Sequence, residues 1–173
     1  MTGIPASFPE QLESLFGAQF PRLFRFLDRL SGDPDLAADL AQEAFVRLHR
    51  RGAMPDAPEA WLVSVALNLF RNSRSTVTRR RRLLAAAGPD AVHQAAAPSP
   101  DGSLIAEEER RQVRAAIDRM PERERQLLLL RGEGLSYRDL AAALSLNEAS
   151  VGTLLARARR AFRIAYEGNL DAP

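Results

Sequence analysis

The chain contains no cysteine, which excludes disulfide bridges, cysteine zinc sites and thiol catalysis and is compatible with a reducing cytoplasm. Histidine is scarce: His49 and His93 are the two present, and neither has a metal-ligating companion at a useful spacing. No acid pair lies beside a candidate nucleophile. We therefore expect no metal, no cofactor and no catalytic residue, and we predict that the chain is not an enzyme.

Long apolar runs are also missing. None approaches the roughly 20 residues that a membrane-spanning helix needs, and the N-terminal segment lacks a basic start followed by an apolar block. We therefore expect a cytoplasmic protein with no membrane insertion. Lysine is missing as well, since all 24 basic residues are arginine, and the net charge is only +2. Two basic patches lie far apart in the sequence, residues 71–82 with six arginines and residues 147–163 with four, as two separate contacts with a polyanion would require.

Alternating strand patterns are absent, whereas helical periodicity is strong on both sides of the middle of the chain. Residues 85–103 are alanine, proline and small polar residues without apolar periodicity, which is typical of a linker. The predicted fold is all-α: a helical domain over residues 8–82, a flexible linker over 83–106 and a second helical domain over 107–168. A chain of 173 residues can hold two such small domains.

The first domain is predicted to contain three main helices. In the first, apolar residues recur at intervals of three and four, which predicts one buried stripe. That stripe consists of Phe16, Phe20, Leu23, Leu27 and Leu30. Gly32 ends this helix, and Asp33-Pro34 predicts the N-cap and first turn of a second helix that runs to about Arg51. The third helix is expected to open near Trp61. Its predicted buried residues are Leu62, Val65, Ala66 and Leu69.

The second domain is predicted to contain a helix-turn-helix. A helix with acids in its first turn precedes Pro121, where another helix begins. Ser136 and Asp139 then resemble a capping box, and Asn147 is the expected N-cap of the last helix. The buried face of that last helix is predicted to hold Val151, Leu155, Ala158 and Phe162. Basic residues beside this face could reach phosphates, namely Arg157, Arg159, Arg160 and Arg163.

Another cluster lies in the first domain, where Asp39, Gln42 and Glu43 fall on adjoining faces of one helix. Three acceptor-bearing side chains in one patch would suit the arginines of a partner protein. The residues alone leave a second interpretation open. In it, the chain is a dimeric helix-turn-helix transcriptional regulator in which residues 10–82 form a sensor or dimerisation domain.

Three segments resemble, in order, the extracytoplasmic-function sigma factors of bacterial RNA polymerase. "DLAQEAFVRLHR" resembles the segment that binds core polymerase. "AWLVSVALNLFRNSRS" resembles the helix that meets the minus-ten promoter element. "MPERERQLLLLRGEGLSYRDLAAALSLNEASVGTLLARARRAF" resembles the helices that meet the minus-thirty-five element. The resemblance covers about residues 10–166. It implies a sigma factor that directs promoter-specific transcription initiation, with core RNA polymerase, promoter DNA and an anti-sigma factor as its partners.

The resemblance also implies roles for individual residues of the first domain. The expected contacts with the clamp helices of polymerase are Asp39, Gln42, Glu43, Phe45 and Val46. The expected contacts with the minus-ten region are Trp61, Asn68, Arg71 and Arg74. The loop at residues 52–60 would lie where the family traps an unstacked base, a step that costs a few kcal/mol and that a pocket must offset.

In the second domain, the resemblance implies a set of DNA contacts at the minus-thirty-five element. They are Ser136, Tyr137, Glu148, Ser150, Thr153, Arg157 and Arg160. The family usually has lysine or arginine early in the recognition helix, whereas this chain has Gly152 and Leu154. Without arginine forks on guanine, base reading falls to Glu148, Ser150, Thr153 or DNA shape. We therefore expect the helix-turn-helix to bind DNA weakly and only within the polymerase complex.

Overall fold

The computed structural model describes the backbone of residues 7–85 and 104–170, and the side chains of residues 7–73 and 107–168. Within these ranges the chain forms seven helices and no strand, so the all-α prediction is confirmed. The chain divides into two compact units, Met1–Ala95 and Ala96–Pro173.

Helices cover both ends of the range that was predicted to be a linker, residues 83–106. Helix α3 (Pro58–Ala85) continues through residues 83–85, and helix α4 (Leu104–Arg119) already includes residues 104–106. The rest of the predicted linker, residues 86–103, lies outside the described residues. The sequence after Arg82 explains the longer helix, because Gly88 is the first residue there that disfavours helix.

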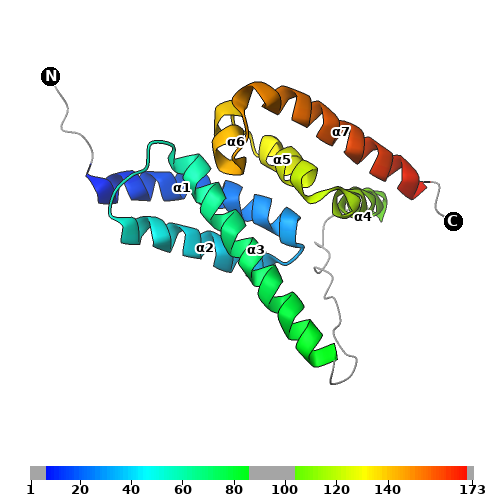
Figure 1. The fold of residues 1–173 in the computed structure, drawn as a ribbon, viewed down its shortest axis with the longest axis horizontal. Coiled ribbons are helices and arrows are strands. Elements are labelled where there is room, and N and C mark those ends of the chain that lie inside the picture. The colour runs from blue at the N-terminus through cyan, green and yellow to red at the C-terminus, as the bar shows by residue number, and fades with distance from the viewer. Residues whose placement is uncertain (1–6, 86–103, 171–173) are drawn as a thin grey trace. The chain divides into compact units, whose positions relative to one another are not determined.

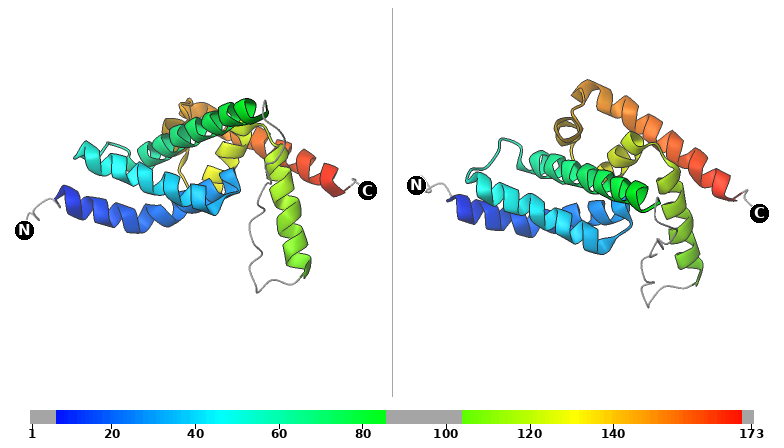
Figure 2. Two further views of the ribbon diagram at one scale, coloured as in Figure 1. Left: turned by 90° about the horizontal axis from the view of Figure 1, so that it is seen from below. Right: turned by 60° about the horizontal axis from the view of Figure 1, so that its bottom comes forward.

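The first unit is built from helices α1 (Phe8–Ser31), α2 (Pro34–Arg51) and α3 (Figure 1). Helix α1 packs along α2, and α3 packs against both of them (Figure 2). Apolar residues from all three helices fill the space between them. The largest fully buried side chains of this core are Phe26, Leu27, Leu48, Leu62 and Leu67.

The helix ends of the first unit follow the predicted signals. Gly32 adopts φ 73° and ends α1, and Asp33 Oδ1 accepts a hydrogen bond from the Leu36 amide at 3.0 Å. Gly52 ends α2 with φ 69°. Helix α3, however, begins at Pro58 rather than near Trp61. Proline favours the first helical position, because its fixed φ suits the helix and its missing N–H would have had no partner there.

Two of the predicted buried stripes are shifted. Phe16 is 46% exposed, and the row of α3 residues that is fully buried differs from the predicted one. That row is Leu62, Val63, Ala66, Leu67 and Phe70, while Val65 and Leu69 are half-buried. Periodicity identifies an apolar face, but the partner helices decide which part of the face is covered. Helix α3 contacts both α1 and α2, and its buried face turns toward the pair.

The second unit contains α4, α5 (Glu122–Gly132), α6 (Tyr137–Leu144) and α7 (Glu148–Leu170). Helix α7 packs against each of the other three helices, and α5 also contacts α6. The core of the unit lies along α7, as predicted. Its fully buried residues there are Val151, Leu155 and Ala158, whereas Phe162 is half-buried.

Helices α6 and α7 form the predicted helix-turn-helix. Ser136 caps α6, because its Oγ accepts a hydrogen bond from the Asp139 amide at 3.1 Å. Asn147 caps α7 by accepting a hydrogen bond from the Ala149 amide at 3.0 Å. Between the helices, Ser145 has φ 53°, a left-handed conformation uncommon for a residue with a Cβ. Leu140, Ala141 and Ala143 are buried and form the inward face of α6, whereas Leu144 is half-buried.

Candidate nucleic-acid and protein interfaces

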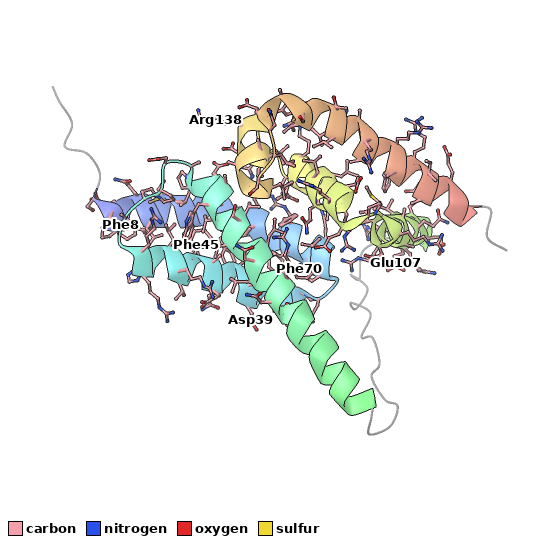
Figure 3. All side chains as sticks on the ribbon, in the orientation of Figure 1. Phe8, Asp39, Phe45, Phe70, Glu107 and Arg138 are labelled. Carbon is pink, nitrogen blue, oxygen red and sulfur yellow. The ribbon has the colours of Figure 1, made fainter. Side chains whose placement is uncertain are left out.

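The polar patch on α2 has the geometry that the sequence predicts. Asp39 and Gln42 are exposed, and Glu43 is half-buried. Glu43 Oε1 accepts a hydrogen bond from Arg47 Nε at 2.9 Å in an i,i+4 ion pair. Figure 3 labels Asp39 on this helix. Because residues three and four apart share a helical face, the patch offers acceptor oxygens side by side to a partner.

Phe45 differs from its neighbours on α2, because its side chain is only 5% exposed. Its ring lies 5.0 Å from that of Phe16 and 6.1 Å from that of Phe20, centroid to centroid. Phe45 therefore belongs to an aromatic cluster between α1 and α2 and has little surface for a partner (Figure 3). Val46, the next residue of α2, is half-buried and more accessible.

An apolar groove of about 420 Å³ lies between the first half of α1 and α2, beside this patch. Its lining residues are Phe8, Pro9, Leu12, Glu13, Phe16, Gln42, Phe45, Val46 and His49. Gln42 and Val46 belong to both the groove and the predicted polymerase contacts. The sequence did not reveal the groove, because the period of the α1 stripe predicts that Phe16 is buried.

The start of α3 holds the predicted minus-ten residues. Trp61 is half-buried, and the guanidinium of Arg51 lies 5.9 Å from the centroid of its ring. Both Asn68 and Arg71 are exposed, and Arg71 Nη1 donates a hydrogen bond to Asn68 Oδ1 at 3.3 Å. The side chain of Arg74 lies outside the described residues.

The loop that joins α2 to α3 covers residues 52–57, because Pro58, Glu59 and Ala60 already belong to the first turn of α3. This range is shorter than the predicted loop at 52–60. Glu59 Oε1 accepts a hydrogen bond from Gln19 Nε2 at 2.6 Å, which ties the end of the loop to α1.

The first turns of α6 and α7 meet at Tyr137, which is 42% exposed. Arg131 lies 5.5 Å from the centroid of the tyrosine ring, and its Nη1 donates a hydrogen bond to the Leu135 carbonyl at 2.8 Å. A Cβ on Gly152 would lie 3.7 Å from Tyr137 Cε2, which is ordinary contact. The tyrosine ring is thus held between Arg131 and the start of the recognition helix.

The remaining predicted minus-thirty-five residues are all exposed. They are Ser136, Glu148, Ser150, Thr153, Arg157 and Arg160. The hydroxyl of Ser136 is already used in the cap of α6. Arg157 differs from Arg160 in having an ion-pair partner, since its Nε lies 3.0 Å from Glu124 Oε1 on α5. The sequence did not indicate this pair, because its members are far apart in the chain.

Residues 7–73 and 107–168 contain no group of three or more metal-ligating side chains that could hold an ion. No helix in the described ranges is both long enough and apolar enough to cross a membrane.

Comparison with known proteins identifies both units. Residues 15–82 match Sigma-70 region 2, and residues 110–162 match Sigma-70 region 4. The sigma factor EcfG of Rhodopseudomonas palustris, an ECF RNA polymerase sigma factor, is 36% identical over 148 residues, which are 83% of this chain and 77% of EcfG. The chain belongs to the extracytoplasmic-function sigma factors. This family consists of transcription initiation factors, and membership favours a sigma factor over a dimeric helix-turn-helix regulator.

Other sigma factors are also similar to this one. The ECF sigma factor SigE of Mycolicibacterium smegmatis is 32% identical over 167 residues, which are 94% of this chain. The chain spans only 63% of the length of SigE. Among solved structures, the sigma factor RpoE of Bartonella quintana, in complex with the anti-sigma factor NepR, has the same fold, with a TM-score of 0.68. That likeness covers 91% of this chain and 97% of RpoE at 23% identity.

Proposed function

We propose that the chain binds core RNA polymerase through α2 and directs it to promoters through α3 and the helix-turn-helix. The observation that carries this proposal is the placement of the family segments. Region 2 falls on the first unit, with Asp39 and Gln42 exposed on α2, and region 4 falls on the second, with exposed arginines on α7. Because its partner is core polymerase, we place the protein in the cytoplasm.

We propose that Asp39, Gln42 and Glu43 accept hydrogen bonds from basic side chains of polymerase. Val46 and the neighbouring groove would add apolar contact beside them, and Phe45 would support the groove from beneath, since it is buried there. Charged pairs across such an interface steer association and specify the partner more than they raise affinity.

At the minus-ten element we propose contacts from α3. Asn68 and Arg71 are exposed there, and Arg74 follows on the same helix. Arginine has no acceptor, so the atom of Asn68 that faces Arg71 is its oxygen. The amide nitrogen of Asn68 remains a donor for a base. The loop at residues 52–57, with Trp61 beside it, would hold an unstacked base.

At the minus-thirty-five element we propose that Tyr137 and Thr153 contact bases while Arg160 contacts phosphate. The first turns of α7 carry no arginine, so bidentate reading of guanine is absent there. An anti-sigma factor is a further proposed partner, since RpoE of Bartonella quintana was solved with one.

The first experiment tests the α2 patch. Replacing Asp39, Gln42 and Glu43 together with alanine is expected to abolish co-purification with core polymerase and run-off transcription. The fold should survive, because the Glu43–Arg47 pair is exposed, and such i,i+4 pairs contribute only about 0.3–0.5 kcal/mol. Circular dichroism checks that helix content is unchanged.

Asp56→Ala is the matched control for polymerase binding alone, because Asp56 is an exposed acid of the same unit that lies in the proposed base-binding loop and not on α2. This variant should co-purify with polymerase as the wild type does. Normal polymerase binding by the triple variant would contradict the assignment of α2 as the core-binding helix.

A further inference from the structure

Glu124 is an acid in an unexpected place, because it faces the basic side of α7. It lies in the first turn of α5, and its side chain is only 13% exposed. Its Oε1 is 3.0 Å from Nε of Arg157, whose side chain is 73% exposed. The pair thus joins a fixed, nearly buried carboxylate to an arginine that projects into solvent from the recognition helix.

This contact uses one edge of the guanidinium. A guanidinium carries five N–H donors in a rigid plane, and its Nε is the nitrogen that forms the ion pair with Glu124. The donors on the two terminal nitrogens remain available for a second oxyanion. Since α5 packs against α7, the Glu124 carboxylate pairs the charge of Arg157 and draws its guanidinium toward α5.

Arg160 provides the contrast. It is exposed on the next turn of α7, and the structure gives it no hydrogen bond or ion pair among the described residues. To bind a phosphate, Arg160 must give up the rotamer freedom of a long side chain, whereas Arg157 has already lost part of that freedom in the free protein.

We propose that Glu124 is a positioning residue of the minus-thirty-five interface, which holds Arg157 so that its terminal nitrogens face a DNA phosphate. This proposal rests on the proposed binding of promoter DNA by α7. It assigns to α5 a part in DNA binding, although Glu124 carries the same sign of charge as DNA.

The sign of one mutational effect distinguishes positioning from simple electrostatics. Removing a carboxylate near DNA removes repulsion, so electrostatics alone predicts that Glu124→Leu binds DNA more tightly. If Glu124 positions Arg157, the same change weakens binding, because the arginine loses its orientation. Glu124→Gln places an amide oxygen beside Nε that can accept a hydrogen bond from it, and it should therefore retain binding while the charge is gone.

The experiment uses the full chain assembled with core polymerase. The probe is a promoter duplex selected from a random pool by the wild-type holoenzyme, and Kd is measured at several salt concentrations. Glu124→Leu is expected to bind roughly tenfold more weakly, which corresponds to about 1.4 kcal/mol, whereas Glu124→Gln should match or exceed the wild type. In an Arg157→Ala background, Glu124→Leu should no longer weaken binding, because no arginine remains to be positioned.

The matching change at Arg160 serves as the control. Arg160→Ala should lower the slope of log Kd against log salt by about 0.9 in every Glu124 background, since each phosphate contact contributes about that much. Thermal unfolding of each variant, followed by circular dichroism, checks that it is folded, and the glutamine variant preserves the packing if the leucine variant does not.

Three results would contradict the positioning role of Glu124. Wild-type or tighter binding by Glu124→Leu would overturn the proposal, as would an equal loss in the presence and absence of Arg157, which indicates a purely structural role. A failure of Glu124→Gln to bind would overturn it as well. If the wild-type holoenzyme selects no duplex at all, the proposed promoter recognition fails first and the positioning role fails with it.

Discussion

Two glycines should respond in opposite ways to replacement by alanine, because one lies inside a helix and the other ends a helix. Gly152 lies within α7, and an added Cβ would meet only Tyr137 Cε2 at 3.7 Å. Gly52 has φ +69°, and an added Cβ would meet nothing within 4 Å. Steric room is therefore similar at both positions, and the difference between them is the backbone conformation.

We predict that Gly152→Ala raises the free energy of unfolding by about 1 kcal/mol, because alanine favours helix over glycine by that amount. Gly52→Ala should lower it by about 1–2 kcal/mol, since a Cβ is disfavoured in the left-handed conformation. Urea unfolding checks both changes, with Trp61 fluorescence following the first unit and the near-ultraviolet absorbance of the two tyrosines, Tyr137 and Tyr166, following the second. A destabilising Gly152→Ala would show that the glycine is needed for the position of Tyr137.

At the residue scale, local signals were predictable and distant pairs were not. Ser136 and Asn147 act as N-caps as expected, because a cap is defined by residues two or three positions away. The Glu124–Arg157 pair and the burial of Phe45 depend on how separate helices pack, and no local pattern encodes that. The sequence therefore predicted which residues are candidate DNA contacts. It did not predict which residues of other helices pair with them, such as Glu124 with Arg157.

At the scale of one element, α1 consists of two unequal halves. Pro21 lies inside the helix, where it lacks the N–H that would bond to the carbonyl four residues earlier. After Pro21, four residues of α1 are buried, namely Leu23, Phe26, Leu27 and Leu30. Before Pro21, no residue of α1 is fully buried, and this half forms one wall of the apolar groove.

We predict that the two halves of α1 differ in local stability. Amide hydrogens in residues 10–20 should exchange much faster than those in residues 23–31, because exchange protection follows burial and local packing. Pro21→Ala should restore a backbone hydrogen bond and slow exchange in the first half. Hydrogen exchange followed by mass spectrometry measures both effects, and α2, which has no interior proline, serves as the internal reference. Uniform protection along α1 would contradict this division.

Elements were predictable wherever stop and start signals are strong. Gly32, Asp33 and Pro34 mark the junction of α1 and α2 in the sequence and in the structure. The start of α3 was misplaced, because Trp61 is the more conspicuous residue while Pro58 is the one that starts the helix. The groove beside α2 could not be foreseen, since a regular apolar stripe predicts burial along the whole of α1, although the second half alone supplies its fully buried residues.

For the whole molecule, the central question is whether the two units are independent when the protein is free. Each unit has its own buried core, and each matches a separate sigma-70 region. The composition of residues 85–103, rich in alanine and proline, still predicts a linker between them. Two units with separate cores can fold without each other and can engage DNA elements that lie apart on a promoter.

We predict that elastase, which cleaves after small residues, cuts the free protein within residues 86–103 and releases two folded halves. Trypsin is the matched control, because residues 83–106 contain neither arginine nor lysine and give it no site. Mass spectrometry locates the cuts, and circular dichroism of the separated halves should show helix in both, since neither core depends on the other. If elastase left residues 86–103 uncut, or if either half lost its helix after separation, the two units would form one cooperative structure, and their independence in the free protein would be disproved.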